Sequence, residues 1–217
     1  MITHIDLSTV LRRTVCDLFS DLVTRPTGAA VRDALEQQLA ESPERTLTII
    51  DFSQVGLLDF SCADEIVAKL LLRYCAPRSH AAPPVLAGAQ GAGAQGMDVV
   101  TALSGTSAVP APPRDVYFLF SGVNASHLDA IETVLERHGL ATVARIASGD
   151  MVLIGTVDEQ ERRAWEAMCQ LGRAHPAELA RATGLEPDET RVVLDTLCRR
   201  RLAMRFEEEY VAVGVGQ

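Results

Sequence analysis

The sequence has few aromatic residues, almost no lysine and no long apolar run. Aromatic residues make up 5% of the 217 residues, which argues against a base-stacking platform for single-stranded nucleic acid. Lys69 is the one lysine among 20 basic residues, and frequent arginine and alanine point to a GC-rich bacterial genome. No apolar run approaches the ~20 residues needed to span a bilayer, and the start lacks the order of a signal peptide. These absences predict a cytoplasmic bacterial protein with no membrane partner.

The cysteines show no metal-binding spacing. They are odd in number, far apart and without a CxxC pair, which predicts free buried thiols in a reducing compartment. The five are Cys16, Cys62, Cys75, Cys169 and Cys198. Zinc needs about four converging nitrogen or sulfur ligands, and a nucleophile motif such as G-x-S-x-G is also absent. The glycines between residues 88 and 96 follow no strand and precede no lysine, unlike a phosphate-binding loop. The sequence therefore predicts no cofactor, no metal and no enzyme activity.

An acidic cluster and two histidines are candidate chemical sites. Asp59, Asp64 and Glu65 have the side chains of general acids or Mg²⁺ ligands. On an α-helix, however, Asp64 and Glu65 point about 100° apart and cannot both aim at one atom unaided. His127 and His138 are expected at the solvated edge of one helix, with no carboxylate partner. We therefore interpret these groups as structural.

Apolar periodicity predicts an α/β domain over residues 1–157. Strands are expected at 46–55, 115–123, 141–147 and 151–157, and helices at 27–42, 57–75 and 124–140. The alternation of strands and helices favours a sheet flanked by helices. Residues 76–114 are rich in Ala, Pro and Gly and contain no aromatic residue, so they are predicted to form a flexible insertion. A short ordered piece is expected within it at 97–103.

The remaining residues, 158–217, show a different pattern. Helices are expected at 158–172, 175–185 and 186–202, followed by strands at 201–206 and 210–214. Gly184 falls where a tight left-handed turn would join the second and third helices. Three helices followed by a hairpin predict a small winged helix-turn-helix domain.

Two segments of the first domain resemble the STAS-like family of bacterial regulatory domains. One has a strand ending in Asp51-Phe52-Ser53, then Val55 and the run Ser61-Cys62-Ala63-Asp64-Glu65, which is close to an S-F-A-D-E signature. The other is VYFLFSGVNASHLDAIETVLERHGL, a strand and helix ending in His138-Gly139-Leu140. The resemblance covers these two segments, on either side of residues 76–114.

The resemblance implies a protein-interaction module that switches between partners. In some members a serine directly after an aspartate is phosphorylated, but here Phe60 follows Asp59. Ser61 is one place later, where it is expected to cap the helix, a role Asp59 could also fill. The resemblance places the interaction face at Asp59, Ser61, Asp64 and Glu65. Charge reversal at Asp64 and Glu65 is expected to weaken partner binding without unfolding the domain.

The charge of the C-terminal domain leaves two functions open. Residues 158–217 hold 9 arginines and 12 acids, a net charge of 9 − 12 = −3, whereas a DNA reader usually has a basic stripe. If the domain binds double-stranded DNA, the expected contacts are Thr190, Arg191, Arg199, Arg200, Arg201 and Arg205. So few contacts would require a homodimer. The two hypotheses are a transcriptional regulator that binds DNA and an adaptor whose winged helix binds protein.

Overall fold

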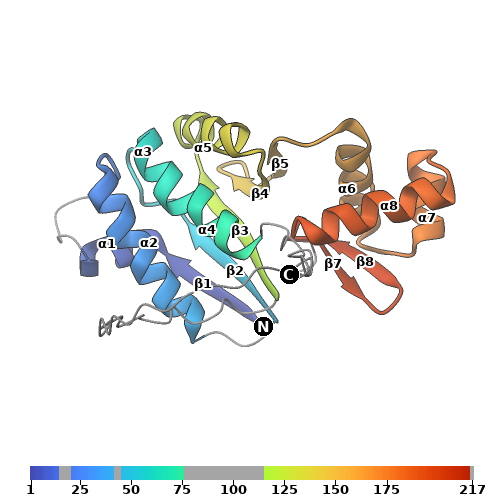
Figure 1. The fold of residues 1–217 in the computed structure, drawn as a ribbon, viewed down its shortest axis with the longest axis horizontal. Coiled ribbons are helices and arrows are strands. Elements are labelled where there is room, and N and C mark those ends of the chain that lie inside the picture. Colours follow the sequence, from blue (N-terminus) through green and yellow to red (C-terminus); the bar gives the residue numbers. More distant parts are fainter. Residues whose placement is uncertain (15–20, 42–44, 76–114, 216–217) are drawn as a thin grey trace, which may run out of the picture.

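The computed structural model describes residues 1–14, 21–41, 45–75 and 115–215, which form two lobes (Figure 1). A five-stranded sheet with helices builds the larger lobe, and three helices with a short sheet build the smaller one. The insertion predicted at 76–114, with its ordered piece at 97–103, lies outside the described residues.

The sheet of the larger lobe is mixed. Its strands are β1 (Ile2–Asp6), β2 (Arg45–Asp51), β3 (Asp115–Val123), β4 (Ala141–Ile146) and β5 (Met151–Gly155), and they lie in this order. β1 to β4 run parallel, and β5 pairs antiparallel with β4. The four strands predicted from the sequence are confirmed, and β1 is an addition at the sheet edge.

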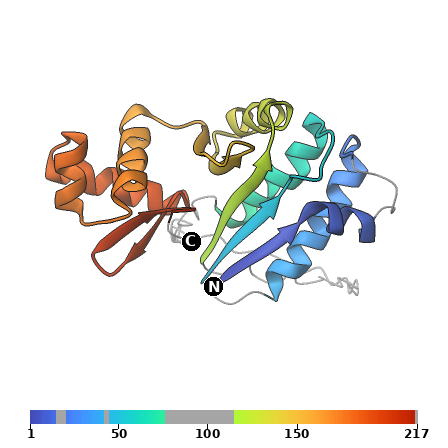
Figure 2. The same ribbon diagram turned by 180° about the vertical axis from the view of Figure 1, so that it is seen from behind.

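The helices that connect these strands cover one face of the sheet (Figures 1 and 2). They are α1 (Leu7–Thr14), α2 (Arg25–Ala40), α3 (Phe60–Ala63), η1 (Asp64–Ala68), α4 (Lys69–Tyr74) and α5 (Ala125–His138). Parallel strands in sequential order joined by right-handed crossovers place every connecting helix on the same side. The apolar helix residues predicted to be buried lie in this core, among them Val31, Leu35, Ile66, Ile131 and Val134.

The helix after β2 contains one wide turn. α3, η1 and α4 are continuous, and η1 is a π-helical segment. The sequence predicts a single helix here, and its buried residues Ile66, Val67, Leu70, Leu71 and Tyr74 are confirmed. A π-helical turn rotates the following side chains relative to an α-helix, and such turns are frequent at functional sites.

The smaller lobe covers part of the opposite face of the sheet. It consists of α6 (Glu159–Leu171), β6 (Arg173–Ala174), α7 (Pro176–Thr183), α8 (Pro187–Arg199), β7 (Ala203–Phe206) and β8 (Glu209–Ala212). The strands form an antiparallel sheet in the order β6-β8-β7. Gly184 ends α7 in the left-handed conformation with φ 72°, as the sequence predicts. The three helices and the terminal hairpin are therefore present.

One apolar core joins the two lobes. Leu47, Ile49, Tyr117 and Leu119 project from the sheet face that the connecting helices leave open. They belong to the same buried cluster as Trp165, Met168, Leu194, Leu197, Leu202 and Val213 of the smaller lobe. The smaller lobe thus completes the core of the sheet.

Candidate interaction surfaces

Asp59 and Ser61 begin the helix that follows β2. The Asp59 carboxylate accepts hydrogen bonds from the Ser61 hydroxyl at 2.6 Å and from the Ser61 backbone N–H at 3.0 Å. These hydrogen bonds hold the pKa of Asp59 below its ordinary value. Asp59 is therefore the N-cap, and the Ser61 hydroxyl donates to it. Of the two caps considered from the sequence, the structure selects Asp59.

Asp64 and Glu65 are buried rather than displayed on a surface. They are 7% and 3% exposed. Within η1 both carboxylates reach one guanidinium, since Arg25 Nη1 lies 3.1 Å from Asp64 Oδ2 and 2.8 Å from Glu65 Oε1. Adjacent residues point well apart in a π-helix as in an α-helix, so the two carboxylates do not converge unaided. They meet because the Arg25 guanidinium, which comes from the neighbouring helix α2, reaches both.

Glu65 is also paired with two further cations. Lys69 Nζ lies 2.5 Å from Glu65 Oε1, and the Arg32 guanidinium donates to Oε2. Burial alone would raise the pKa of the Glu65 carboxyl, but Lys69, Arg25 and Arg32 outweigh it and lower that pKa. These contacts join α2 to η1. The expectation that Asp64 and Glu65 form an accessible interaction face is therefore wrong, because their carboxylates hold two helices together.

The two histidines of α5 are not solvated side chains without partners. His127 is fully buried against the Phe52 ring, and burial lowers its pKa. His138 Nε2 lies 2.8 Å from Asp64 Oδ1. Burial acts to raise the pKa of Asp64, but hydrogen bonds from His138 and Arg25 bring it below its ordinary value. The sequence missed these contacts because they join residues that lie far apart in the chain.

Of the described cysteines, Cys62 and Cys75 are buried, and Cys169 and Cys198 are half-buried. Cys62, Cys75, Cys169 and Cys198 are free, and Cys16 lies outside the described residues. Burial raises the pKa of Cys75 and Cys169 to about 12 and that of Cys198 to about 11. A thiol with such a pKa remains protonated near neutral pH, and the thiolate is the reactive form. Among the described residues, no three His, Cys, Asp or Glu side chains gather as a metal site would require.

Two of the arginines expected to contact DNA are turned inward, toward partners within the chain. Arg200 Nη1 lies 2.6 Å from the buried carboxylate of Glu161, and its Nη2 donates to the Thr156 carbonyl. Arg201 Nη1 lies 2.7 Å from Asp115 Oδ1, and its guanidinium packs over the Tyr117 ring. The two side chains are 23% and 22% exposed. Their charges are neutralised within the chain, which corrects their assignment as phosphate contacts.

The other four expected DNA contacts differ in their exposure to solvent. Thr190 is fully buried, and its hydroxyl donates to the Glu186 carbonyl at 3.0 Å. A side chain in that position cannot reach a base, so its assignment as a DNA contact is wrong. Arg191, Arg199 and Arg205 are exposed. Arg191 lies 3.1 Å from Asp188, which partly neutralises its charge.

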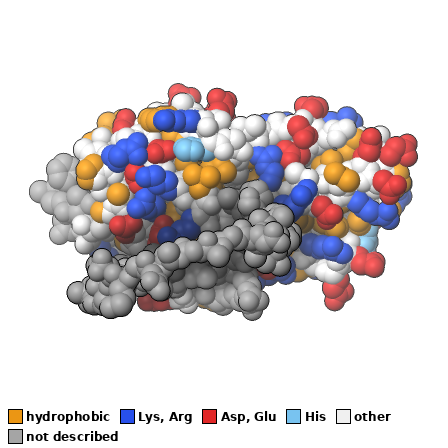
Figure 3. Space-filling view, viewed as in Figure 1, with side chains coloured by type: hydrophobic (Ala, Val, Ile, Leu, Met, Phe, Trp, Pro, Cys, Tyr) orange, Lys and Arg blue, Asp and Glu red, His pale blue; other side chains and the backbone are white. Residues whose placement is uncertain are grey.

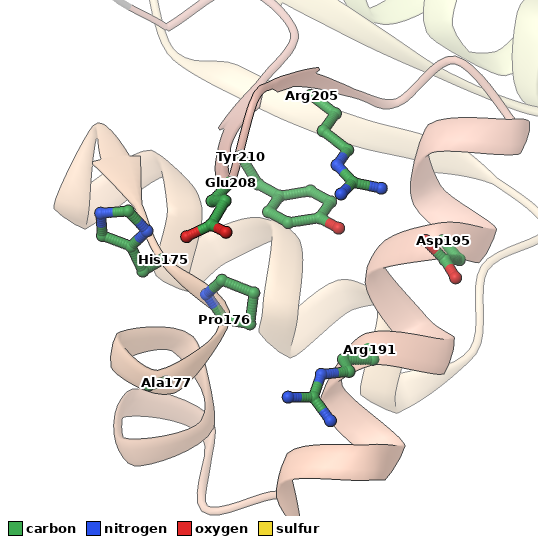
Figure 4. Close-up of a pocket in the computed structure, with 8 residues that line it drawn as sticks. All are labelled: His175, Pro176, Ala177, Arg191, Asp195, Arg205, Glu208 and Tyr210. Carbon is green, nitrogen blue, oxygen red and sulfur yellow. The ribbon is translucent and has the colours of Figure 1, made fainter.

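A pocket of about 440 Å³ lies between α7, α8 and the β7–β8 hairpin (Figure 4). Arg205, Glu208 and Tyr210 project into it from the hairpin, opposite Arg191 of α8. His175, Pro176, Ala177 and Asp195 complete the lining. Burial raises the pKa of the Tyr210 phenol, and the nearby Arg205 acts against that shift. The pocket therefore presents charges of both signs.

A second hollow adjoins this pocket and is more apolar. Pro176, Ala177 and Arg191 line both, and Ala180, Arg181, Leu185, Glu186 and Pro187 complete the second. Its volume is about 460 Å³. Together the two form one groove along α7 and α8, which we call the α7–α8 groove. A groove with apolar walls and both signs of charge suits a polypeptide better than a polyanion.

Sequence reasoning missed several groove residues. His175, Asp195, Glu208 and Tyr210 lie on different elements, and only the folding of the hairpin over α8 brings them together. The signal available in the sequence was the acidic content around the third helix and the hairpin tip, Glu186, Asp188, Glu189 and Glu207–Glu209. That signal indicated acidic groups on this side of the domain, but neither the arginines beside them nor the shape of the groove.

Comparisons with known proteins complete the description of these surfaces. No helix in the described part of the chain has both the length and the apolar character of a membrane span. The chain matches no protein-family model, no curated protein and no solved structure.

Proposed function

We propose that this chain is a non-enzymatic regulatory adaptor in which a STAS-like α/β domain carries a winged-helix domain that binds protein rather than DNA. The winged-helix domain corresponds to the smaller lobe, α6 to β8. Its protein-binding surface is the α7–α8 groove with the exposed side of α8. The STAS-like part supplies the sheet on which this lobe is held.

The inward orientation of Arg200 and Arg201 is the observation that carries the proposal. The Arg200 guanidinium is engaged with the buried Glu161 of α6 and with the Thr156 carbonyl, and the Arg201 guanidinium is engaged with Asp115 of the larger lobe. Breaking such contacts to bind phosphate would leave the buried Glu161 carboxylate unpaired, at a cost of several kcal/mol. Of the arginines expected to contact DNA, Arg191, Arg199 and Arg205 remain exposed.

The charge around the remaining arginines also supports protein binding. Glu186, Asp188 and Glu189 occupy the start of α8, the part of the third helix that would meet base edges if the domain bound DNA. Asp195 and Glu208 line the pocket itself. Phosphate groups next to these carboxylates would be repelled, whereas a polypeptide can present matching charges of both signs.

Fluorescence anisotropy with a labelled DNA duplex tests this proposal. The full chain at micromolar concentration and low salt is expected to give no saturable binding. The matched variant Asp195→Arg/Glu208→Arg removes the groove carboxylates and is expected to raise DNA affinity, which shows that the assay can detect such binding. Saturable wild-type binding with a logarithmic salt slope of about −3, as three phosphate contacts would give, overturns the proposal and restores the DNA-binding regulator.

A further inference from the structure

We infer that the protein partner of α8 is a second copy of this chain, paired antiparallel about a two-fold axis. The inference rests on the protein-binding function proposed above and names the partner for the same surface. It is carried by the order of charges along the exposed side of α8.

Charges of alternating sign lie along this side of the helix. The residues are Asp188, Arg191, Asp195 and Arg199, spaced by three, four and four positions. At about 100° per residue they remain within about 80° of arc, so they form one stripe. Val192 lies beside the stripe and is 63% exposed, which is unusual for a large apolar side chain. In Figure 3 acidic, basic and apolar side chains lie next to one another over α8.

The order of charges in the stripe is self-complementary when two copies of α8 run antiparallel. A two-fold axis midway between residues 188 and 199 places Asp188 level with Arg199 of the second copy. With a rise of 1.5 Å per residue, Arg191 is then offset by about 1.5 Å along the helix axis from Asp195 of the second copy. The two Val192 side chains lie within about one helical turn of each other. Because a two-fold contact uses each patch twice, four oppositely charged pairs form around one apolar centre.

Contacts within the chain leave these charges available. The Asp188–Arg191 ion pair is highly exposed, with side-chain exposures of 95% and 66%, and such pairs contribute little to stability. Asp195 has no ion-pair partner within the described ranges. The Arg199 guanidinium donates to the Asp195 carbonyl at 3.3 Å and to the Thr196 hydroxyl at 3.0 Å. Within the described ranges, Asp195 and Arg199 therefore break no ion pair when they pair with the second copy.

The interface has the character of a weak association. One pair of 13-residue helices with a single large apolar residue near its centre buries little apolar area. Most of its specificity comes from exposed charges, which salt screens. We therefore expect a dimer that forms at micromolar concentrations and dissociates as the salt concentration rises.

Sedimentation equilibrium of the full chain tests this inference. Wild-type protein is expected to be dimeric at high micromolar concentration in low salt. Asp195→Arg places the new arginine of each copy opposite Arg191 of the other copy. The repulsion is expected to raise the dimer dissociation constant about tenfold or more. Arg191→Asp/Asp195→Arg exchanges the charges and is expected to restore the constant to within about threefold of wild type.

A matched control uses another exposed helix. Glu166→Arg makes the same kind of charge change on α6 and is expected to leave the dissociation constant unchanged. A monomeric wild-type chain, a dimer insensitive to Asp195→Arg, or a double variant that fails to recover each overturns the inference. A monomer that binds no DNA in the anisotropy assay overturns the inference alone, whereas DNA binding by the wild type overturns the proposed function.

Discussion

At the scale of single residues, the buried carboxylates of η1 serve stability. Glu65 has almost no access to solvent and contacts cations from α2 and α4. A buried charge of this kind is tolerated because it is paired, and removing one partner leaves the others uncompensated. Asp64 and Glu65, two of the four residues that the S-F-A-D-E resemblance marked as a binding face, therefore hold the helical layer together.

Glu65→Gln is expected to reduce the free energy of unfolding by about 3 kcal/mol, because it leaves Arg32 and Lys69 facing a neutral amide. Urea unfolding followed by circular dichroism measures the change. Asp33→Asn is the matched control, since Asp33 also pairs with Arg32 but is exposed, and it should change stability by less than about 0.5 kcal/mol. Equal effects from the two variants would show that Glu65 is not structural.

The lowered pKa of Asp64 predicts how stability depends on pH. Its folded pKa lies below the ordinary value of 3.8, so the folded state favours the carboxylate. The resulting stabilisation is complete above the unfolded pKa and is lost as pH falls through the folded pKa. The stability difference between wild type and Asp64→Asn is therefore expected to shrink on acidification below about pH 4. Urea unfolding across this pH range measures it, and a constant difference would contradict the assignment.

At the scale of elements, the last residues of β3 pack tightly against the end of β2 and the loop that follows it. Gly122 has φ 69°, and a Cβ added there would lie 2.6 Å from the Ser53 nitrogen and 2.7 Å from Asp51 Oδ1. Gly139, at the end of α5, has a similar φ of 64° but open space around it. Comparing substitutions at these two glycines therefore distinguishes the cost of the left-handed backbone conformation from the cost of steric crowding.

Gly139→Ala is expected to destabilise the protein by about 1 kcal/mol, the cost of the left-handed conformation in an L-residue. Gly122→Ala carries the same cost, and the backbone of Ser53 must also move, so its loss should exceed that of Gly139→Ala by at least about 1 kcal/mol. Thermal unfolding of the two variants compares them directly. Equal losses of stability in the two variants would mean that the loop after β2 moves to accommodate the added Cβ at little energetic cost.

Local patterns predicted most elements, and long-range contacts account for the errors. The continuous apolar runs of β2 and β3 and the capping residues of α5 are local signals that the fold preserves. β1 was missed because a five-residue strand with two exposed polar positions gives little pattern. The meeting of Asp64 and Glu65 at Arg25 depends on a residue 39 and 40 positions away in the chain, which local patterns do not reveal. Arg200 and Arg201 looked like a basic cluster because their acidic partners lie 39 and 86 residues away.

At the scale of the whole molecule, the shared core couples the lobes. Trp165 is the one tryptophan, and it lies in the cluster that contains Leu119 of the sheet and Leu194 of α8. Its fluorescence reports on the contact between the lobes, whereas far-ultraviolet circular dichroism reports on all the helices. Coupling through a common core predicts that the two signals change together.

Leu119→Ala is expected to destabilise both lobes by about 2–5 kcal/mol, because it opens a cavity in the core they share. Denaturant titrations followed by Trp165 fluorescence and by circular dichroism should move to the same lower midpoint. Separate midpoints for the two signals, with only one of them shifted, would show that the lobes unfold independently.

The one-sided arrangement of helices also has a consequence during synthesis. The apolar sheet face with Leu47, Ile49 and Leu119 is complete once β5 has emerged from the ribosome, but its cover includes residues as late as Val213. At about 5–20 residues per second, translation of the roughly 60 residues that separate these events takes about 3–12 s. During that interval the nascent chain displays an apolar sheet that chaperones and other nascent chains can bind. Codon choice in the last quarter of the gene therefore affects how much of this protein reaches the folded state.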